Sequence, residues 1–551
     1  MDPELVTQIN GDTGETLTKS KLRIRSIRCA QNLTKLGCTQ DDRIGVSARN
    51  HHNLTPLLYG AIFNGSPICP FNALTVKYRI YVLLDRVRPS FIFCDADVLA
   101  SVKEIVNNIG FSSKFFIVNG WADGYESIDS LMNETGDEDS FVKIEDAFSY
   151  AAVISCSSGS TSMPKVVGIS HAHFIHTLKV QFLGSKHTAF SFSSMFWIAG
   201  TLGMLRCALT VTRVFTAKPF SPDLFFDFVE KYKIHQSPGA ALFFLFDVSY
   251  LFIQTIREAE ENSQKITKST YGQRRPTLQF FFGPPCQIQA FLKSERCENA
   301  DLSSLLVCFS VGGFVPSVLV QTLKKLVPKC LLLTTYGMTE VCGSATCTLP
   351  NELEEQPNSG GRLVPGFIIK IINENTGEKC GIGEEGEIYI KTLMPSVGYY
   401  KDETATRNSF DKEGYFISGD LGYFDGSGRL IIIGRKKEIF KNCGFAIWPA
   451  ELESLIVNNP AIKDASVVSV FDDDIMSDLP AAVVVKKESH SITEDEVYAI
   501  IADKLASYKR LDGGVYFVDE LPMTPSGKII RPKVKEITQN IYQQRKLSQK
   551  S

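Results

Sequence analysis

Short runs of apolar residues alternate along most of the chain with stretches that have the period of an amphipathic helix. The runs Phe91–Cys94 and 115–118 are rich in aromatic and β-branched side chains, which predicts buried strands. Residues 97–109, which lie between them, predict a helix. Alternation of this kind is typical of α/β proteins with largely parallel sheets. We therefore expect a large N-terminal α/β domain of stacked sheets and helices over residues 1–434.

The pattern changes after residue 435, where a smaller α+β unit is predicted. Pro449 stands at the first position of a predicted helix, where its missing N–H is not needed. Thr493 is the predicted cap of a second helix. Three strands are expected, at residues 465–470, 481–485 and 515–518. The charged residues 435–437 are predicted to form a hinge, which makes residues 438–551 a small, mobile C-terminal domain.

Composition narrows the class of protein. Of 551 residues, 44% are hydrophobic and 22% are charged, a globular balance that excludes a disordered or fibrous chain. The formal net charge of -3 argues against a broad surface for nucleic acid. The longest apolar stretch, 241–256, contains Asp247 and is too short to be a transmembrane segment, and the acidic N-terminus does not resemble a signal peptide. We expect a soluble intracellular protein.

Cysteines and histidines give no strong metal signal. The 14 cysteines are scattered without a C-x-x-C pair, which favours buried, reduced thiols. His171, His173 and His176 form the only histidine cluster in the sequence. Because neither cysteine nor glutamate lies close to them along the chain, we do not expect a zinc site there.

The strongest chemical signal is the segment Ser157-Ser-Gly-Ser-Thr-Ser-Met-Pro-Lys165, which closely follows an apolar strand predicted at 151–154. A loop dense in glycine and hydroxyl side chains can fold its backbone N–H groups around an anion, and Lys165 adds a positive charge. The segment is not a Walker A loop, because Lys165 is followed by Val166 rather than serine or threonine. On its own, such a Ser/Gly turn is more often a linker.

Three motifs further along the chain indicate that this segment binds phosphate rather than serving as a linker. It resembles the phosphate loop of the adenylate-forming superfamily, which contains acyl-CoA synthetases, coumarate–CoA ligases and beetle luciferases. Tyr336-Gly-Met-Thr-Glu340 resembles the superfamily's adenine and magnesium segment. Residues 415–420 and 434–441 resemble its ribose-binding and hinge region, and Pro522-Met-Thr-Pro-Ser-Gly-Lys528 resembles its C-terminal lysine loop. The motifs occur in the superfamily's order, and the similarity is closest to insect luciferase-like acyl-CoA synthetases.

The resemblance implies a two-step reaction that uses ATP, Mg²⁺ and coenzyme A. A carboxylate first attacks the α-phosphate of ATP, which gives an acyl-adenylate and pyrophosphate, and the thiol of coenzyme A then displaces AMP. The expected partners are therefore small molecules: a carboxylic acid, ATP and coenzyme A. Because two anions meet in the first step, positive charge and N–H donors are needed where negative charge develops.

The resemblance also implies catalytic roles. Lys528 is expected to bridge the attacking carboxylate and the α-phosphate, and Lys441 is expected to serve the second half-reaction. Thr339 is expected to contact the α-phosphate. Glu340 is the expected ligand of Mg²⁺, a hard cation that prefers oxygen donors.

Further residues are implied to hold the nucleotide. Asp420 is expected to accept hydrogen bonds from both ribose hydroxyls, with help from Arg435. The residues implied for the β- and γ-phosphates are Ser157, Ser158, Gly159, Ser160, Thr161 and Lys165. The residues implied for adenine are Tyr336 and Gly337, with Gly312 and Gly313 allowing close backbone approach.

Some positions depart from the superfamily's pattern. Ser162 and Val166 stand where glycine is usual, and a side chain at a position of positive φ costs about 1 kcal/mol and can obstruct a phosphate. We expect impaired activity if Val166 has such a conformation. Serines replace histidine in the motif at 192–197. The aromatic residues Phe196, Trp197 and Phe314 are predicted to form the wall of an acyl pocket for medium-chain or aromatic acids, or else to be ordinary core residues.

Two features concern the chain as a whole. Its N-terminus begins late by the superfamily's standard, so that a first helix and strand are expected to be missing. Residues 235–280 form an insert that the pattern does not explain and that is longer than an ordinary loop. We interpret the insert as a retained intron or a gene-model error, which sequencing of the transcript would test.

We predict an ATP-dependent acyl-CoA synthetase that activates a fatty acid, of medium chain length, or an aromatic acid. One alternative is a luciferase-like monooxygenase that oxidises its acyl-adenylate, and another is a catalytically impaired nucleotide-binding protein. Members of the superfamily often end in a peroxisomal Ser-Lys-Leu signal, which the last residues of this chain, 546–551, do not contain. The expected location is therefore peroxisomal by family, or cytoplasmic.

Overall fold

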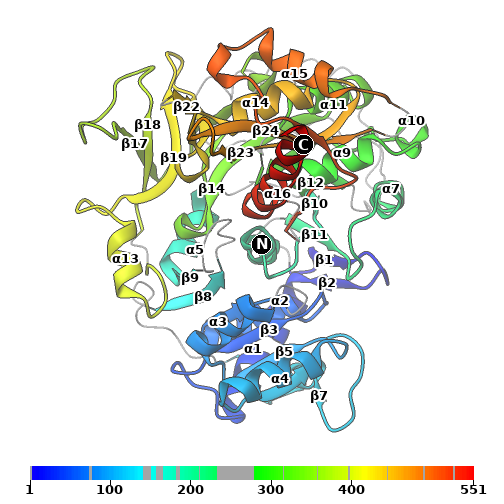
Figure 1. Cartoon of the computed structure of the whole chain (residues 1–551). Coiled ribbons are helices and arrows are strands. Elements are labelled where there is room, and N and C mark those ends of the chain that lie inside the picture. The colour runs from blue at the N-terminus through cyan, green and yellow to red at the C-terminus, as the bar shows by residue number, and fades with distance from the viewer. Residues whose placement is uncertain are drawn as a thin grey trace.

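A computed structural model describes most of the chain (Figure 1). The described residues are 3–72, 77–139, 150–156, 165–180, 187–209, 211–232, 278–313, 315–356, 358–394, 397–442, 445–487, 490–524 and 528–550. Nearly all of the predicted insert at 235–280 lies outside them, so its interpretation stays a prediction.

The first large sheet has seven strands in the order β7-β6-β5-β3-β4-β8-β9. All neighbours in it are parallel except β8 and β9, which are antiparallel. Its strands are β3 (Ile44–Ser47), β4 (Ile68–Pro70), β5 (Phe91–Cys94), β6 (Lys114–Ile117), β7 (Glu126–Ser127), β8 (Ala151–Cys156) and β9 (Val166–Ser170). The helices along this part of the chain are α1 (Lys19–Lys35), α2 (Leu54–Asn64), α3 (Lys77–Val87), α4 (Leu99–Ile109) and α5 (His171–Val180). The strands predicted at 91–94 and 115–118 and the helix predicted at 97–109 are therefore confirmed, with shifts of one or two residues.

The second sheet has thirteen strands, in the order β17-β18-β19-β20-β16-β15-β14-β13-β12-β10-β11-β1-β2. It is parallel from β1 through β11, β10, β12 and β13 to β14, and antiparallel from β14 to β17. The strands of its parallel half are β1 (Val6–Asn10), β10 (His187–Phe190), β11 (Val211–Phe215), β12 (Leu278–Gly283), β13 (Val307–Val311) and β14 (Leu331–Met338), with β2 (Thr16–Thr18) antiparallel at the edge. The antiparallel half contains β15 (Gly343–Cys347), β16 (Ser359–Leu363), β17 (Phe367–Ile372), β18 (Gly386–Thr392), β19 (Phe416–Phe424) and β20 (Leu430–Arg435). The helices between these strands are α6 (Ile198–Cys207), α7 (Pro222–Lys231), α9 (Pro285–Leu292), α10 (Arg296–Asn299), α11 (Ser317–Leu326), α12 (Glu352–Glu355) and α13 (Glu403–Ser409).

The two sheets share one apolar core. Buried side chains of α2 and α6, such as Leu57 and Met204, belong to the same cluster as Phe93 of the first sheet and Phe309 of the second. Burial of this kind is the main source of stability in a globular protein. The expected fold class, a large α/β part of stacked, largely parallel sheets, is confirmed. A strand at 429–434 is also expected from the sequence and corresponds to β20, but the antiparallel pairing of β15–β20 was not predicted.

A smaller C-terminal part follows β20 and is coloured orange to red in Figure 1. It contains a two-stranded sheet, β21 (Phe440–Asn442) and β22 (Phe445–Ile447), and a three-stranded sheet, β23 (Ile462–Asp472), β24 (Ser477–Lys486) and β25 (Val515–Phe517). Its helices are α14 (Pro449–Val457), α15 (Glu494–Ala502) and α16 (Arg531–Lys550). As predicted, Pro449 opens α14, and the Thr493 hydroxyl accepts from the Glu496 N–H in a capping box at the start of α15.

The C-terminal part contacts the larger part near α11 and α14. The Ser317 hydroxyl donates to the Asn458 amide oxygen over 2.8 Å. At the joint itself, Lys436 pairs with Glu374 and, over 3.1 Å, with Glu387. The joint therefore has fixed electrostatic partners on the larger part. Within the described parts of the chain, no helix combines the length and the apolar character that crossing a lipid bilayer requires.

Candidate active site

Three residues predicted for the nucleoside lie on adjacent parts of the thirteen-stranded sheet. The Tyr336 hydroxyl donates to Asp420 Oδ2 over 2.7 Å, and Arg435 Nε lies 2.8 Å from Asp420 Oδ1. Asp420 and Arg435 face each other in the register of β19 and β20, so strand pairing itself brings them together. Each oxygen of the Asp420 carboxylate therefore has a partner from a different strand.

Burial shapes the electrostatics of this group. Only 4% of Asp420 is exposed, and burial raises its pKa, while Arg435, Tyr336 and Lys528 oppose that rise. Burial lowers the pKa of Arg435, but Asp420, together with smaller contributions from Tyr336, Glu438 and Glu340, outweighs this and raises it. The site thus holds a buried carboxylate against a permanent cation, which is the usual condition for a charge inside a protein.

Two of the glycines predicted to lie near adenine stand at positions where the local backbone geometry favours glycine. A Cβ on Gly337 would lie 2.0 Å from the carbonyl oxygen of Gly343 on the paired strand β15, so a side chain does not fit there. Gly312 has a φ of +81°, which favours glycine, and a Cβ on it would lie 3.7 Å from Lys528 Cε. The turn after β13 therefore lies beside the side chain of Lys528. Gly313 follows in the same exposed turn.

Lys528 comes from the C-terminal part and reaches this group. A turn closed by the Thr524 N–H, which donates to the Lys528 carbonyl over 2.7 Å, carries the lysine. Desolvation, and then Arg435, lower the pKa of Lys528, while Asp420 and Glu340 partly oppose the shift. The Lys528 side chain therefore lies beside the turn after β13, and the Asp420 and Glu340 carboxylates both act electrostatically on its ammonium group.

Lys165 and Glu340 are connected on the phosphate side of the site. Lys165 Nζ lies 3.4 Å from the Tyr399 hydroxyl and 3.4 Å from the Ser409 hydroxyl, and 4.4 Å from the centre of the Tyr399 ring. The Tyr399 hydroxyl in turn donates to Glu340 Oε1 over 3.3 Å. Sequence reasoning missed Tyr399 and Ser409. No local pattern in the sequence places them beside Lys165, because the pairing of residues 398–400 with β9 brings them there.

The turn that carries Thr339 and Glu340 rests on α5. Thr339 opens the short 3-10 helix η2 (Thr339–Val341), directly after β14. The imidazole of His173 is hydrogen-bonded to the backbone of Val341, and burial lowers the pKa of His173 to about 4. The Thr177 hydroxyl donates to the Cys342 carbonyl over 3.4 Å. Two residues of α5, His173 and Thr177, therefore contact the turn that carries Thr339 and Glu340. His173 belongs to the histidine cluster noted in the sequence.

Val166 does not have the positive φ for which reduced activity was expected. It begins strand β9, pairs with Cys156 of β8 and is completely buried, and its φ is not positive. The strain expected for a side chain at a left-handed position therefore does not arise, and that reason for reduced activity is removed. Ser162 lies outside the described residues.

The remaining predicted site residues lie away from the group around Asp420 or outside the described residues. Lys441 lies in β21 and is exposed, and Phe196 and Trp197 are half-buried with ring centres 4.6 Å apart. Their roles stay predictions. The residues that fall outside the described chain are Ser157, Ser158, Gly159, Ser160, Thr161 and Phe314.

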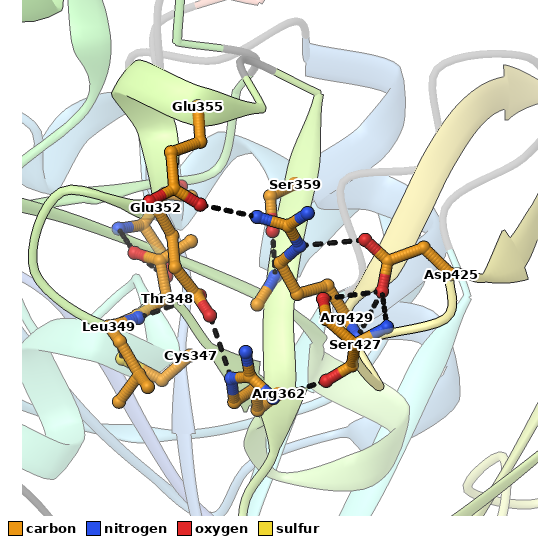
Figure 2. Close-up of polar contacts among 12 residues, drawn as sticks. Cys347, Thr348, Leu349, Glu352, Glu355, Ser359, Arg362, Asp425, Ser427 and Arg429 are labelled. Carbon is orange, nitrogen blue, oxygen red and sulfur yellow. Dashed lines mark hydrogen bonds and ion pairs between the residues drawn. The ribbon is translucent and has the colours of Figure 1, made fainter. Parts of the chain in front are cut away.

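Polar contacts anchor the hairpin that carries Asp420 and Arg435 (Figure 2). Arg429, at the turn between β19 and β20, pairs with Asp425 over 2.7 Å and with Glu355 of α12 over 3.0 Å. Arg362 of β16 pairs with Glu352 of α12 over 2.7 Å and donates to the backbone at Ser427 in the same turn. The turn is thus tied to α12 and β16, which fixes the far end of the hairpin.

The residues fit a magnesium ion that arrives with ATP. Glu340 supplies a carboxylate, and within the described residues it belongs to no group of three acidic, histidine or cysteine side chains. Mg²⁺ is commonly bound through one or two carboxylates and substrate phosphates, with water as the remaining ligands. When bound, it neutralises charge on the phosphates. Glu340 is therefore the residue that would hold a magnesium ion brought by ATP.

The stacked sheets, the smaller C-terminal part and a lysine that crosses from one to the other define an adenylate-forming enzyme. The chain belongs to the AMP-binding enzyme family: the family model matches residues 2–400, and the model of the AMP-binding enzyme C-terminal domain matches residues 451–528. The resemblance inferred from the four motifs is confirmed.

Individual relatives agree with this assignment. A probable 4-coumarate–CoA ligase of Dictyostelium discoideum is 28% identical, over 97% of this chain and 92% of the relative. Luciferin 4-monooxygenase of Photinus pyralis is also 28% identical, over 93% of this chain and 87% of the relative. The crystal structure of ATP-bound MatB from Rhodopseudomonas palustris has the same fold, with a TM-score of 0.80 and 21% identity over 98% of this chain and 97% of MatB.

Proposed function

We propose that the chain is an ATP-dependent acyl-CoA synthetase that activates a medium-chain fatty acid or an aromatic carboxylic acid. The observation that carries the proposal is the place of Lys528, a residue of the C-terminal part whose Cε lies 3.7 Å from the position of a Cβ on Gly312, beside the turn after β13 of the larger part. An ammonium group brought from the C-terminal part to the edge of the nucleoside site can offset the repulsion between a carboxylate and an α-phosphate.

The first half-reaction follows from this arrangement. A carboxylate oxygen of the acid attacks the α-phosphorus, the bond to the β-phosphate breaks, and pyrophosphate leaves. Asp420 and Arg435 hold the nucleoside, Lys528 offsets the repulsion between the two anions, and Lys165 attracts the leaving pyrophosphate. Positioning and charge stabilisation are the main contributions that a protein makes to phosphoryl and nucleotidyl transfer.

The second half-reaction needs a different group. The thiol sulfur of coenzyme A attacks the acyl carbon, and AMP leaves with the electron pair of the broken C–O bond. Lys441 is proposed for this step, after the C-terminal part turns about residues 435–437. Domain rotation about a few residues at a joint is a common device in enzymes with two steps.

The proposed substrate class rests on Phe196 and Trp197. Their rings make an edge-to-face contact at 4.6 Å and are only half-buried, so apolar ring surface remains available beside α6. A rigid aromatic wall shortens an acyl pocket and favours short or flat substrates.

A substrate panel tests the proposal. The full chain is incubated with ATP, Mg²⁺ and coenzyme A, and with fatty acids of increasing length, benzoate or 4-coumarate, while pyrophosphate and acyl-CoA are measured. We expect both products in equal amounts, with the highest rate for medium-chain or aromatic acids. An acid that releases pyrophosphate and consumes oxygen without forming acyl-CoA would support the monooxygenase alternative instead. Absence of pyrophosphate with every acid would refute the proposal.

A further inference from the structure

Two charged groups of opposite sign on the phosphate side share one neutral partner. The Tyr399 hydroxyl is 3.4 Å from Lys165 Nζ and donates to Glu340 Oε1 over 3.3 Å. The ammonium also lies over the ring of the same tyrosine, with 4.4 Å between the nitrogen and the ring centre. The hydroxyl is therefore placed between a cation assigned to the β- and γ-phosphates and an anion assigned to the metal.

The backbone holds Tyr399 firmly in this place. Gly398 accepts from the Gly168 N–H over 2.9 Å, and the Tyr400 N–H donates to the Val166 carbonyl over 2.7 Å, so this segment pairs with β9. The Tyr399 N–H donates to the Thr406 hydroxyl over 2.9 Å. Gly398 has a φ of +78°, and a Cβ there would lie 2.5 Å from Thr406 Cγ2. The phenol is thus fixed by a turn that only glycine allows.

The Tyr399 hydroxyl is a neutral partner for both charges. Tyr399 is 5% exposed, and an ordinary phenol, with a pKa of about 10, is neutral at pH 7. A neutral phenol has one donor and can also accept, so it can serve an ammonium and a carboxylate simultaneously. The Ser409 hydroxyl, also buried, is a second partner of Lys165.

We propose that Tyr399 is a positioning residue that holds the Lys165 ammonium and the Glu340 carboxylate at a fixed separation. Without the hydroxyl, the two opposite charges attract each other directly at short range. A direct pair would turn the lysine away from the polyphosphate and occupy the carboxylate that the metal needs. The inference rests on the proposed function, because that function assigns Lys165 to phosphate and Glu340 to the metal.

The substitution Tyr399→Phe tests the inference by binding alone. It removes the hydroxyl and keeps the ring, so the contact between Lys165 and the aromatic face remains. We expect the affinity for ATP with Mg²⁺ to fall about tenfold, the effect of one hydrogen bond that involves charged groups. The affinity for AMP is expected to stay unchanged, because the AMP contacts proposed at Tyr336, Asp420 and Arg435 do not involve Tyr399. Calorimetric titration of the full chain with each nucleotide measures both.

Tyr400→Phe is the matched control. The Tyr400 hydroxyl accepts from Arg43 Nε over 2.7 Å and is the neighbouring hydrogen-bonded phenol in the sequence. Its loss is expected to change neither affinity. Equal thermal transitions of the two variants and the unaltered chain establish that both have folded.

A double substitution distinguishes positioning from a simple loss of packing. Glu340→Gln removes the negative charge that would capture Lys165, so adding Tyr399→Phe to it is expected to weaken ATP binding less than Tyr399→Phe does alone. Interaction of this kind between contacting residues is what a double-mutant cycle measures. Additive effects would overturn the inference.

The outcomes for the inference and for the proposed function are separate. If the unaltered chain binds neither AMP nor ATP, the proposed function fails. If it binds both, and Tyr399→Phe weakens neither or weakens both equally, the proposed function stands and the positioning role of Tyr399 is refuted.

Discussion

The nucleoside side and the phosphate side of the site are built differently. On the nucleoside side, Asp420 is held by contacts of 2.7 Å and 2.8 Å from residues of the same sheet. On the phosphate side, Lys165 and Glu340 meet the Tyr399 hydroxyl at 3.4 Å and 3.3 Å. Lys165 precedes β9 of the seven-stranded sheet, whereas Glu340 follows β14 of the thirteen-stranded sheet. One side depends on strand register and the other on a segment that connects two sheets.

This difference between the two sides indicates that one binds the nucleotide and the other serves the reaction. Short, charge-assisted contacts within one sheet leave little freedom, so the nucleoside side is complete before a ligand binds. Longer contacts in an unliganded site often tighten when substrate binds. We therefore expect the nucleoside side to determine affinity for AMP, and the phosphate side together with Lys528 to determine the rate.

The largest effect is expected for Lys528→Ala. The substitution removes the ammonium group that interacts with Asp420 and Glu340. Loss of one preorganised electrostatic contact in a transition state typically costs about a hundred- to a thousandfold in rate. We expect that loss in ATP–pyrophosphate exchange driven by the best acid of the panel, with AMP affinity preserved.

Lys533→Ala is the control for that loss. Lys533 is an exposed residue of α16, five positions further along the same C-terminal part. Its removal is expected to leave exchange unchanged. Retention of full exchange by Lys528→Ala would refute the catalytic assignment, and an equal loss of AMP affinity would break the division between the two sides.

The next largest effect is expected for Asp420→Asn, measured as AMP affinity. The amide keeps the shape of the side chain but removes the charge that Arg435 Nε meets at 2.8 Å. Contacts to a charged group contribute about 1.5 to 3 kcal/mol each, so we expect affinity to fall about a hundredfold. AMP titration of the variant measures the loss. Unchanged AMP affinity would show that the nucleoside binds elsewhere.

The sequence could predict the nucleoside side better than the phosphate side for a physical reason. Asp420 and Arg435 stand in motifs whose strands β19 and β20 pair directly, and Tyr336 stands on β14 of the same sheet, so the motifs lie within one sheet. Tyr399 and Ser409 stand in a connection after β18 and in α13, and only the tertiary pairing of residues 398–400 with β9 brings them to Lys165. Their roles depend on contacts that no local pattern records.

The same limit of local sequence patterns applies to the prediction of the fold. Runs of apolar residues such as Phe91–Cys94 and caps such as Thr493 act locally, and the elements that they predict are present. The antiparallel strands β15–β20 depend on pairing across the sheet, which apolar periodicity alone does not specify. Val166 is a further example, because its buried place in β9 follows from pairing with β8, which the local sequence does not specify.

The alkaline pH dependence of the rate is the third prediction. Desolvation and Arg435 lower the pKa of Lys528 below the usual 10.5. Because the ammonium form is the one that attracts both anions, the rate falls as pH rises through this lowered pKa, and the fall occurs at a lower pH than free lysine would give. Exchange measured against pH at ATP concentrations well below saturation, where the rate reports the pKa values of the free enzyme, checks this. In Lys528→Arg, whose guanidinium stays charged, the residual rate is expected to lack that fall. A wild-type rate that stays constant up to the range of free lysine would contradict the prediction.

The smallest effect on the rate is expected for Val166→Gly, although its effect on stability is clear. The valine is completely buried in β9 and belongs to an apolar cluster with Ile92 and Ile154. Removing a buried side chain and adding backbone freedom in a strand costs about 2 to 4 kcal/mol of unfolding free energy. Urea unfolding measures that cost, and exchange is expected to stay at the wild-type rate because Val166 causes no strain.

A second substitution of a β-branched residue by glycine separates the stability lost with the buried side chain from the stability lost through greater backbone freedom. Ile368 lies in β17 and is 42% exposed, so Ile368→Gly removes a β-branched side chain from a strand with less burial. We expect it to cost less stability than Val166→Gly, since mainly the backbone term remains. If Val166→Gly instead raised the rate of exchange, the side chain would be obstructing the phosphate side. The long contacts between Lys165, Tyr399 and Glu340 would then reflect that obstruction.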